Sequence, residues 1–275
     1  MNDLDTLFNK IKDGYENKNG DIKFLKAMKN EALFGFSEIE QFLKKSIKIL
    51  EIGCGSGLLS AIIGNKDLNI TSLEPIESGF SKTELLLNST QKFYSNKFNL
   101  VRKTIENFDT EEKFDLIFSI NVFEHIQNWN LALLKSIDML NKNGKLIILC
   151  PNYCFPYESH FRIPIIFNKK ITSIIFSKYI NNYEKKYDSL GLWNSLNFIK
   201  ITEIKKHLPN NVTIDFDKSI LIRMVNRLFN DKCFNERQKF LGYFTKLFSK
   251  MNLHNFYTLL PMNFQPYQKI IIQKK

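Results

Sequence analysis

Residues 49–60, ILEIGCGSGLLS, have the types and spacing of a ligand-binding loop. An apolar run includes the acid Glu51, and Gly53, Gly55 and Gly57 follow at every second position. Because glycine weakens regular structure, this spacing indicates a backbone that turns sharply or lies close to a ligand. A dinucleotide loop has the spacing G-x-G-x-x-G, in which the third glycine stands one position later than it does here. A carboxylate before the loop favours a ligand with a cationic group, since a helix N-terminus alone suits a phosphate.

Histidines are the second set of side chains that could do chemistry. His160 lies in an aromatic loop after an apolar segment, and we expect it to be a general base for an alcohol acceptor. His125 is the second candidate for the same role. Four neighbours of His160 are expected to contact the acceptor: Tyr153, Tyr157, Glu158 and Arg162. The alternative interpretation is that these residues only hold the loop in place, and His207 and His254 are expected to lie on helical stretches as surface or packing residues.

Alternating strands and helices must position these side chains. Apolar segments predict five strands, at 46–53, 69–75, 98–103, 113–120 and 145–151. Helical patterns predict intervening helices at 57–65, 78–95 and 128–144, the last closed by Gly144. This alternation predicts a parallel sheet covered by helices on both faces, with ligands bound at the carboxyl ends of its strands. Ser37 and Glu40 have capping-box spacing, which predicts a helix that starts near residue 38.

The regular alternation of predicted strands and helices ends after Pro151. No five-residue strand is evident in 152–170, and the remaining predictions are helices at 201–208, 219–230 and 236–252 and strands at 212–217 and 267–275. The 236–252 helix carries an aromatic stripe at Phe240, Phe244 and Phe248 with lysines nearby. Such a stripe favours packing as part of a substrate lid, and the alternative is peripheral membrane contact by a basic amphipathic helix.

The order of these motifs resembles that of class I S-adenosylmethionine-dependent methyltransferases. LEIGCGSG resembles their first motif, and TIENF, FDLIFSINVFEHI and NKNGKLIILCPNY resemble the later ones. The resemblance implies that Glu74 accepts hydrogen bonds from the ribose, that Ile105 packs on the adenine with Glu106 near its amino group, and that Asn121 lies beside the methionine moiety. It implies the cofactor S-adenosylmethionine, the product S-adenosylhomocysteine and a cofactor site made of Glu51, Gly53, Cys54, Gly55, Gly57, Glu74, Pro75, Ile105, Glu106 and Asn121.

The resemblance also implies a fold, and one departure from the family pattern bears on metal binding. The expected fold is Rossmann-like, with a seven-stranded, mostly parallel sheet and a C-terminal helical substrate cap. A single domain is expected, divided into an N-terminal helical segment (1–45), a cofactor-binding core (46–153) and a region with the substrate loop, cap and last two strands (154–275). Some relatives hold a divalent metal with E-x-x-E-H, but here the first position is Asn121, so no metal site is predicted. The segments after the fifth strand look similar to bacterial methyltransferases of surface glycans and small metabolites.

Charge and composition restrict the partners. Residues 1–150 carry a net charge of −1, from 19 Lys and Arg and 20 Asp and Glu, whereas residues 151–275 carry +12, from 20 and 8. This asymmetry favours an anionic partner, although a solvated basic surface is the plain alternative. Four cysteines without a CxxC pair, and no apolar segment long enough to span a bilayer, predict a cytoplasmic protein. Oligomeric state is not predicted.

The function expected from these observations is O-methylation of a small molecule, such as a sugar or a phosphorylated metabolite. A nucleic-acid methyltransferase is an alternative prompted by the basic half, but NVFE after the fourth strand lacks the prolines that present an amino base. No appended RNA-binding module is evident either. A non-catalytic S-adenosylmethionine-binding protein is the third reading.

Overall fold

The chain forms two compact units in a computed structural model. The described residues are 2–16, 20–75, 81–187, 189–238 and 260–275. Unit 1 comprises Met1–Ile120, Leu131–Ile147 and Gln273–Lys275, and unit 2 comprises Asn121–Asn130 and Ile148–Ile272. Each unit is described by itself below.

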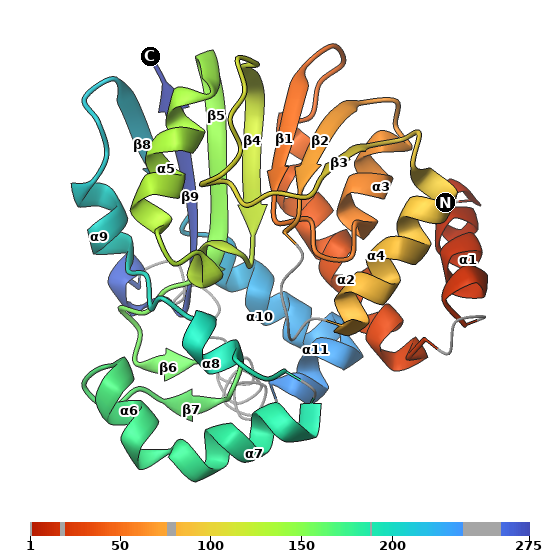
Figure 1. Ribbon diagram of the computed structural model, residues 1–275. Coiled ribbons are helices and arrows are strands. Elements are labelled where there is room, and N and C mark those ends of the chain that lie inside the picture. Colours follow the sequence, from red (N-terminus) through yellow and green to blue (C-terminus); the bar gives the residue numbers. More distant parts are fainter. Residues whose placement is uncertain (1, 17–19, 76–80, 188, 239–259) are drawn as a thin grey trace. The chain divides into compact units, whose positions relative to one another are not determined.

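A seven-stranded, mostly parallel sheet confirms the predicted α/β class. Its strands are hydrogen-bonded in the order β3-β2-β1-β4-β5-β9-β8 (Figure 1). The strands are β1 (Lys48–Ile52), β2 (Asn69–Leu73), β3 (Asn99–Val101), β4 (Phe114–Ile120), β5 (Leu140–Pro151), β8 (Val212–Phe216) and β9 (Tyr267–Lys274). All seven segments match predicted strands in place and type, except that β5 begins earlier than expected. A separate two-stranded sheet joins β6 (Tyr157–Glu158) to β7 (Ile163–Pro164).

In unit 1, β1 pairs in parallel with β2 and β4, and β2 pairs in parallel with β3. Its helical elements are α1 (Asn2–Glu16), α2 (Ile22–Ile39), η1 (Glu40–Phe42), α3 (Leu58–Gly64), α4 (Ser81–Tyr94) and α5 (Trp129–Asp138), whose first two residues belong to unit 2. Leu7, Ile11 and Tyr15 recur at four-residue spacing on α1 and are buried in the same core as Leu86 of α4. This spacing explains why α1 and α4 lie side by side in Figure 1.

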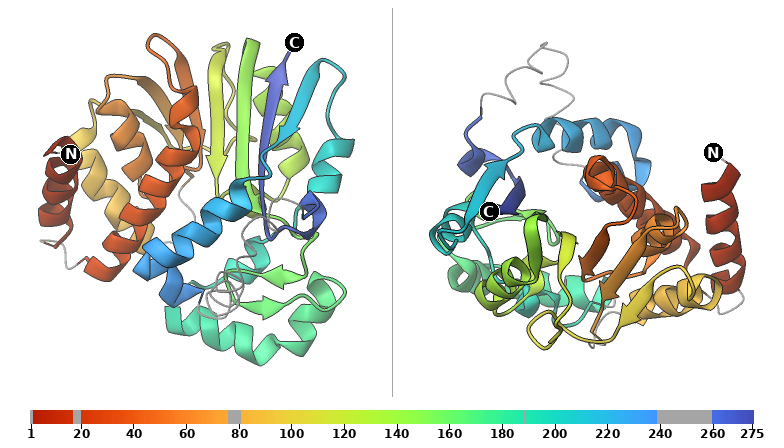
Figure 2. Two further views of the ribbon diagram at one scale, coloured as in Figure 1. Left: turned by 180° about the vertical axis from the view of Figure 1, so that it is seen from behind. Right: turned by 90° about the horizontal axis from the view of Figure 1, so that it is seen from above.

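In unit 2, β8 lies beside β9, as both views of Figure 2 show. Its helical elements are η2 (Phe123–His125), α6 (Lys169–Ile175), α7 (Ser177–Tyr187), α8 (Leu192–Ser195), α9 (Ile201–Lys206), α10 (Ile220–Asn230), α11 (Lys232–Arg237) and η4 (Met262–Phe264). A small core joins β7 to α7 and α8 through Phe161, Ile163, Ile180, Trp193 and Leu196. This core anchors the loop that carries His160.

Two predictions about helix ends are wrong. Ser37 does not cap a helix, because α2 runs through it and its hydroxyl donates to the carbonyl of Phe34 at 2.7 Å. The cap of α2 is Asp21, whose carboxylate accepts from the backbone N–H groups of Lys23 and Phe24 at 3.0 and 3.1 Å. The spacing of Ser37 and Glu40 resembles a capping box, but Ser37 lies inside α2. The apolar face of this longer helix was not recognised from the sequence.

Gly144 does not close a helix either. Helix α5 ends at Asp138 and β5 begins at Leu140, so Gly144 lies within the strand. A Cβ atom at this position would lie 2.9 Å from the carbonyl oxygen of Asn141 in β5 itself and 3.0 Å from that of Phe114, the first residue of β4. The glycine is required by the close approach of two backbones rather than by a helix terminus.

The predicted helix at 236–252 falls mostly outside the described residues, and so do His254, the aromatic stripe and the membrane contact predicted for it. Among the helices that the structure describes, none is both long and apolar enough to cross a membrane. Cys54, Cys150, Cys154 and Cys233 are free thiols.

Candidate functional site

The glycine loop of unit 1 is a left-handed turn at the carboxyl end of β1. Gly53, Gly55 and Gly57 have φ angles of 74°, 52° and 71°, which residues with side chains rarely adopt. The N–H groups of Gly53 and Cys54 both donate to the carbonyl of Leu73 at 2.9 Å, so the loop is tied to the end of β2. Cys54 itself is buried, and burial raises the pKa of its thiol well above the usual value. The sequence spacing therefore reflects a conformation that only glycine adopts without strain.

Gly55 and Gly57 differ in the space beside their Cα atoms. A Cβ on Gly57 would lie 2.8 Å from Cδ1 of Leu87 and 3.2 Å from the ring of Phe98. Among the residues that the structure describes, the atom nearest to a Cβ on Gly55 would belong to Thr83, at 3.8 Å. Gly57 is thus packed against the body of unit 1, whereas Gly55 leaves open space at the turn in which a ligand could lie against the backbone.

Glu51 is a buried acid with hydroxyl partners. It is 4% exposed, and strand register places it opposite Ser72. Its Oε2 accepts a short hydrogen bond from the hydroxyl of Ser60 on α3, and the Ser72 hydroxyl lies 3.5 Å from the same oxygen. Burial, followed by the nearby charge of Glu74, raises the pKa of Glu51 to about 8 against the lowering effect of the two serines. At neutral pH this carboxyl is mainly protonated, and a cationic ligand close by would favour its ionised form.

The other cofactor candidates of unit 1 lie at the ends of β2 and β3. Glu74 is half-buried, and its Oε2 accepts from the N–H of Gly55 at 2.6 Å, so the acid and the loop are in direct contact. Pro75 follows it and is also half-buried. Ile105 is 2% exposed, and the backbone carbonyl of Glu106 accepts from the ammonium of Lys135 at 2.7 Å. The structure therefore brings Glu51, Glu74 and the three glycines together.

Asn121, the remaining cofactor candidate, belongs to unit 2. It directly follows β4 and adopts a left-handed φ of 55°. Its backbone N–H donates to the carbonyl of Leu149 at 2.8 Å, which ties it to β5. Its side-chain oxygen Oδ1 is buried and has no hydrogen-bond partner within the described part of the chain. An unpartnered buried acceptor of this kind suits a donor supplied by a ligand.

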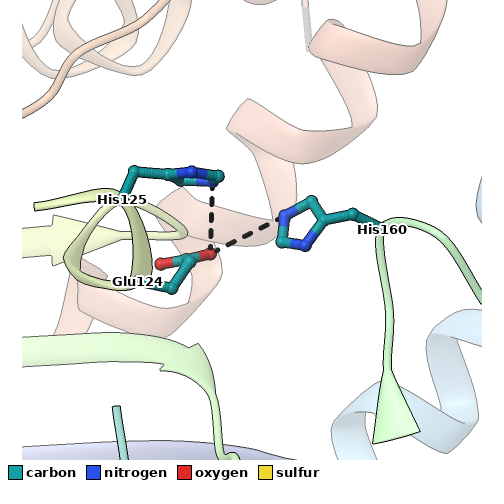
Figure 3. A group of neighbouring side chains, drawn as sticks. All are labelled: Glu124, His125 and His160. Carbon is teal, nitrogen blue, oxygen red and sulfur yellow. Dashed lines mark ion pairs between the residues drawn. The ribbon is translucent and has the colours of Figure 1, made fainter. Parts of the chain in front are cut away.

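A cluster of one acid and two histidines is the chief feature of unit 2. Nε2 of His125 and Nε2 of His160 each lie 4.0 Å from Oε1 of Glu124, as Figure 3 shows. The two imidazole rings meet edge to face, with centroids 5.2 Å apart. We call these three residues the histidine cluster. Both candidate bases predicted from the sequence belong to it.

Each imidazole is held through its other nitrogen. Nδ1 of His125 lies 2.8 Å from the hydroxyl of Ser195 at the end of α8. Nδ1 of His160 lies 2.7 Å from Oε1 of Glu158 in β6. These contacts point both Nε2 atoms toward Glu124.

The titration of the cluster follows from burial and neighbouring charge. Burial, and then the charge of His160, lower the pKa of His125 to about 3. Burial also lowers the pKa of His160, but the charge and hydrogen bond of Glu158 and the charge of Glu124 outweigh it, so the net shift is upward. Burial raises the pKa of Glu124 to about 7, against the opposing charge of His160. The pKa of Glu158 is lowered, because its charge and hydrogen-bond contacts with His160 and Phe161 together outweigh burial.

The turn that carries Glu124 and His125 is clamped by Asn197. Its side-chain amide donates to the carbonyl of Phe123 at 2.6 Å and to that of Ile126 at 2.8 Å, and its backbone N–H donates to the carbonyl of Glu124 at 2.7 Å. Because three hydrogen bonds hold so short a turn, the Glu124 and His125 side chains are fixed in direction. This positioning role could not be recognised from the sequence, since Asn197 lies in a loop with no distinctive pattern.

The predicted acceptor contacts fall into two groups. Tyr153 and Glu158 are buried in support of His160, and the Tyr153 hydroxyl donates to Oε1 of Glu158 at 3.3 Å. Tyr157 and Arg162 are half-buried, and the Arg162 guanidinium donates to the hydroxyl of Tyr183 at 3.3 Å. The hydroxyl of Tyr157 donates to the side chain of Gln238 at 3.4 Å, and burial raises its pKa to about 12.

Several residues of the site were not predicted. They are Glu124 in the histidine cluster, Ser195 and Asn197 beside it, and Ser60 and Ser72 around Glu51. Glu124 had a signal in the sequence, because it stands next to His125 in an acid–histidine pair. Ser72 had a weaker one, as a polar residue in an apolar strand.

Comparison with known proteins places the chain among methyltransferases. A family model described as a methyltransferase domain matches residues 24–199. An uncharacterized protein of Mycobacterium tuberculosis, Rv1509, is 30% identical over 230 residues, which are 82% of this chain and 78% of that protein. A ubiquinone biosynthesis O-methyltransferase of Rickettsia canadensis is 25% identical over 232 residues, 83% of this chain and 87% of that protein. Among solved structures, the plantazolicin methyltransferase BpumL in complex with SAH has a TM-score of 0.46 at 17% identity, and the match covers 97% of this chain and 90% of that one.

Proposed function

The chain belongs to the family of S-adenosylmethionine-dependent methyltransferase domains, and on this premise we propose that it methylates an oxygen atom of a small organic acceptor. A sugar or a phosphorylated metabolite is the acceptor class that we favour, because residues 151–275 carry a net charge of +12 and would attract an anionic group. The relatives named ubiquinone biosynthesis O-methyltransferases support oxygen as the acceptor atom.

The residues of each unit suit S-adenosylmethionine. The open face of Gly55 lets a ligand lie on the backbone, and the carboxylate of Glu74 beside it can accept hydrogen bonds from ribose hydroxyls. The unpartnered Oδ1 of Asn121 can accept from the ammonium of the methionine moiety. Bound S-adenosylmethionine supplies an electrophilic methyl group on a positively charged sulfonium.

The chain's own contribution to transfer is orientation and proton removal. The acceptor oxygen forms a bond to the methyl carbon while the sulfur–methyl bond breaks and its electron pair remains on sulfur. Because orientation alone can contribute about 7–11 kcal/mol, no covalent intermediate with the protein is required. An alcohol oxygen must also lose its proton, and we propose that His160 accepts it at Nε2 while Glu158 holds Nδ1. His125 is the second candidate for this role.

One observation carries the proposal of a hydroxyl acceptor. Two imidazoles and one carboxyl converge in unit 2, with both Nε2 atoms 4.0 Å from Oε1 of Glu124. A phosphate or carboxylate oxygen is already anionic and would need only basic clamps. A cluster of proton-accepting groups is therefore most useful for an acceptor that arrives protonated.

A transfer assay with methyl-labelled S-adenosylmethionine tests the proposal. Free sugars, sugar phosphates, phenols, RNA and DNA are offered in parallel, and labelled product and S-adenosylhomocysteine are measured. We expect label on a hydroxyl of one small-molecule class. With that acceptor, His160→Ala should lower turnover by about 10²–10⁴-fold, the usual range for a general base.

His207→Ala is the matched control, because His207 is exposed and its Nδ1 lies 2.8 Å from the carbonyl of Glu203 in α9. Wild-type turnover in His160→Ala would remove the base assignment. Label only on nucleic acid, with affinity that falls steeply with salt, would replace the small-molecule proposal by a nucleic-acid methyltransferase.

A further inference from the structure

We propose that Glu124, His125 and His160 of the histidine cluster bind a divalent transition-metal ion of the Zn²⁺ type. Each residue offers one ligand atom, and the three atoms all lie within 4.8 Å of one another (Figure 3). The proposal shares its residues with the proposed proton transfer, but it is tested by metal binding and does not depend on any methyl acceptor.

The two distances from Glu124 suit a metal ion. Zn²⁺ bonds to histidine nitrogen and carboxylate oxygen are about 2.0–2.2 Å long, so two of them span up to roughly 4.2 Å. Both Nε2-to-Oε1 distances in the cluster are 4.0 Å, which lies within that span. In a tetrahedral site the same atoms would be roughly 3.4 Å apart, and small side-chain rotations would provide that approach.

Glu124 lacks the hydrogen bonds that a buried acid normally has. Its side chain is 0% exposed, and in the described ranges neither carboxylate oxygen has a hydrogen-bond partner. Burying an acid without partners is unfavourable, so buried carboxylates are usually paired or coordinate metals. A bound cation would supply the missing partner.

The hydrogen bond of His125 leaves Nε2 with a lone pair. The Ser195 hydroxyl donates its one proton to the carbonyl of Leu192 at 2.8 Å, because a carbonyl can only accept. The same hydroxyl oxygen must therefore accept from Nδ1–H of His125, at 2.8 Å. Neutral His125 then carries its free electron pair on Nε2, the atom that faces Glu124.

His160 is oriented in the same way by an acid. Oε1 of Glu158 accepts from Nδ1 of His160 at 2.7 Å and from its backbone N–H at 3.1 Å, and Oε2 accepts from the N–H of Phe161 at 2.6 Å. Histidines that ligate metals commonly donate their other ring N–H to a carboxylate, a carbonyl or a hydroxyl, which fixes the ring and the tautomer. Both histidines of the cluster meet this condition.

The donor set points to the metal. Two imidazole nitrogens and one carboxylate oxygen are the ligands of catalytic zinc sites and of the two-histidine, one-carboxylate iron sites. Mg²⁺ prefers oxygen ligands and water. The side chains of His125 and His160 are 21% and 25% exposed, so a fourth ligand could reach the ion from solvent.

The sequence predicted no metal because Asn121 stands where the known acidic pattern has its first ligand. The third ligand in the structure is instead His160, which comes from the loop after β5. A hydroxyl bound to such an ion loses its proton more readily, so the metal-loaded enzyme would not need His160 as a base.

Metal titration of the full chain tests the site. The protein is stripped with a chelator and titrated with Zn²⁺ in a calorimeter, without S-adenosylmethionine or acceptor. We expect one ion per chain. His125→Ala and His160→Ala should each weaken binding by more than the about 10–100-fold typical of removing an outer partner. His207→Ala, outside the cluster, should bind like the wild type.

Ser195→Ala keeps all three ligands and removes only the group that orients His125. We expect binding about 10–100-fold weaker, with recovery in Ser195→Thr, which retains the hydroxyl. Circular dichroism establishes that each variant is folded. The Co²⁺-substituted protein should show absorption of a site with nitrogen and oxygen ligands.

Three outcomes would overturn the proposal. They are the absence of saturable Zn²⁺ binding to the folded wild type, Zn²⁺ binding in the two histidine variants that is as tight as in the wild type, and a Co²⁺ spectrum dominated by thiolate charge transfer. The last would place the ion on cysteine rather than on the histidine cluster. A protein that binds Zn²⁺ at this cluster but methylates no hydroxyl would contradict only the proposed function.

Discussion

Glu51 lies in β1, and Glu124 lies in the turn after β4. Both acids are buried, yet their surroundings differ. Glu51 is 4% exposed and Glu124 is 0% exposed, and burial raises their pKa values to about 8 and about 7. Two serine hydroxyls lie against the carboxyl of Glu51. No donor in the described residues reaches the carboxyl of Glu124, which instead faces two imidazole nitrogens. Burial alone therefore does not distinguish the two acids, whereas their hydrogen-bond partners do.

The two regions also differ in how they are built. The loop around Glu51 comes from one continuous stretch, residues 49–60, and is tied to the neighbouring strand β2. The histidine cluster draws on η2, the loop after β5, and α8. The following predictions test whether Glu51 and its loop behave as a self-sufficient structure, in contrast to a cluster whose carboxyl, Glu124, has no hydrogen-bond partner among the described residues.

The largest expected effect is the pH dependence that Glu51 imposes on stability. Its folded-state pKa of about 8 exceeds the ordinary value of 4.5, so the folded protein binds more protons between these values. Stability from this group is complete below about pH 4.5 and is lost as the pH rises to about 8, with a slope of up to about 1.4 kcal/mol per pH unit. Urea denaturation of wild type and Glu51→Gln from pH 5 to 8 measures the difference. Glu111→Gln, at an exposed acid, is the control, and equal slopes in all three proteins would contradict the prediction.

Substitution of the loop glycines should show which one is packed. Gly57→Ala places a Cβ 2.8 Å from Leu87 at a φ of 71°, so we expect about 2–4 kcal/mol lower stability from backbone strain and overpacking together. Gly55→Ala has a φ of 52° and open space, and should lose only the strain, about 1–2 kcal/mol. Both are measured by urea denaturation. Equal losses would mean that the space around Gly57 adjusts freely.

The cofactor role of Glu74 should appear as an affinity change. Hydrogen bonds to a charged group contribute about 1.5–3 kcal/mol, so Glu74→Ala should weaken S-adenosylmethionine binding by about 10–100-fold. Isothermal titration calorimetry measures this, with Glu112→Ala as the control. Unchanged affinity in Glu74→Ala would remove Glu74 from the cofactor site and leave it a structural role, to which its contact with Gly55 belongs.

The smallest effect concerns the hydroxyl partner of Glu51. Ser60→Ala leaves the buried carboxyl short of a donor and should cost about 1–2 kcal/mol of stability. Ser119→Ala is the matched control, because Ser119 is buried in β4 and its hydroxyl has no partner in the part of the chain that the structure describes. We expect it to change stability by under about 0.5 kcal/mol. An equal loss of stability in the two variants would show that the hydrogen bond from Ser60 to Glu51 adds no stability beyond that of any buried serine.

Sequence patterns predicted some elements of the fold well and others poorly. The five apolar segments from 46 to 151 all became strands, because continuous apolar runs are typical of parallel strands. The capping-box spacing of Ser37 and Glu40 was misleading, since the signal is local and α2 is stabilised by its buried face. Gly144 was misassigned because the backbone that crowds it comes partly from its own strand, at Asn141, and partly from β4, at Phe114, which is distant in the chain.

The sequence by itself identified the methyl donor, S-adenosylmethionine. Left-handed turns demand glycine at fixed positions, and an acid at a strand end keeps its place relative to the loop, so the motif could be recognised from consecutive residues. Only the tertiary structure decided what surrounds the histidines. His125 and His160 were predicted as alternative bases, but folding places both against Glu124 and gives each a separate partner, Ser195 and Glu158. The physical reason is that side-chain electrostatics depend on neighbours in space, and these neighbours come from segments whose order in the chain does not indicate that they meet.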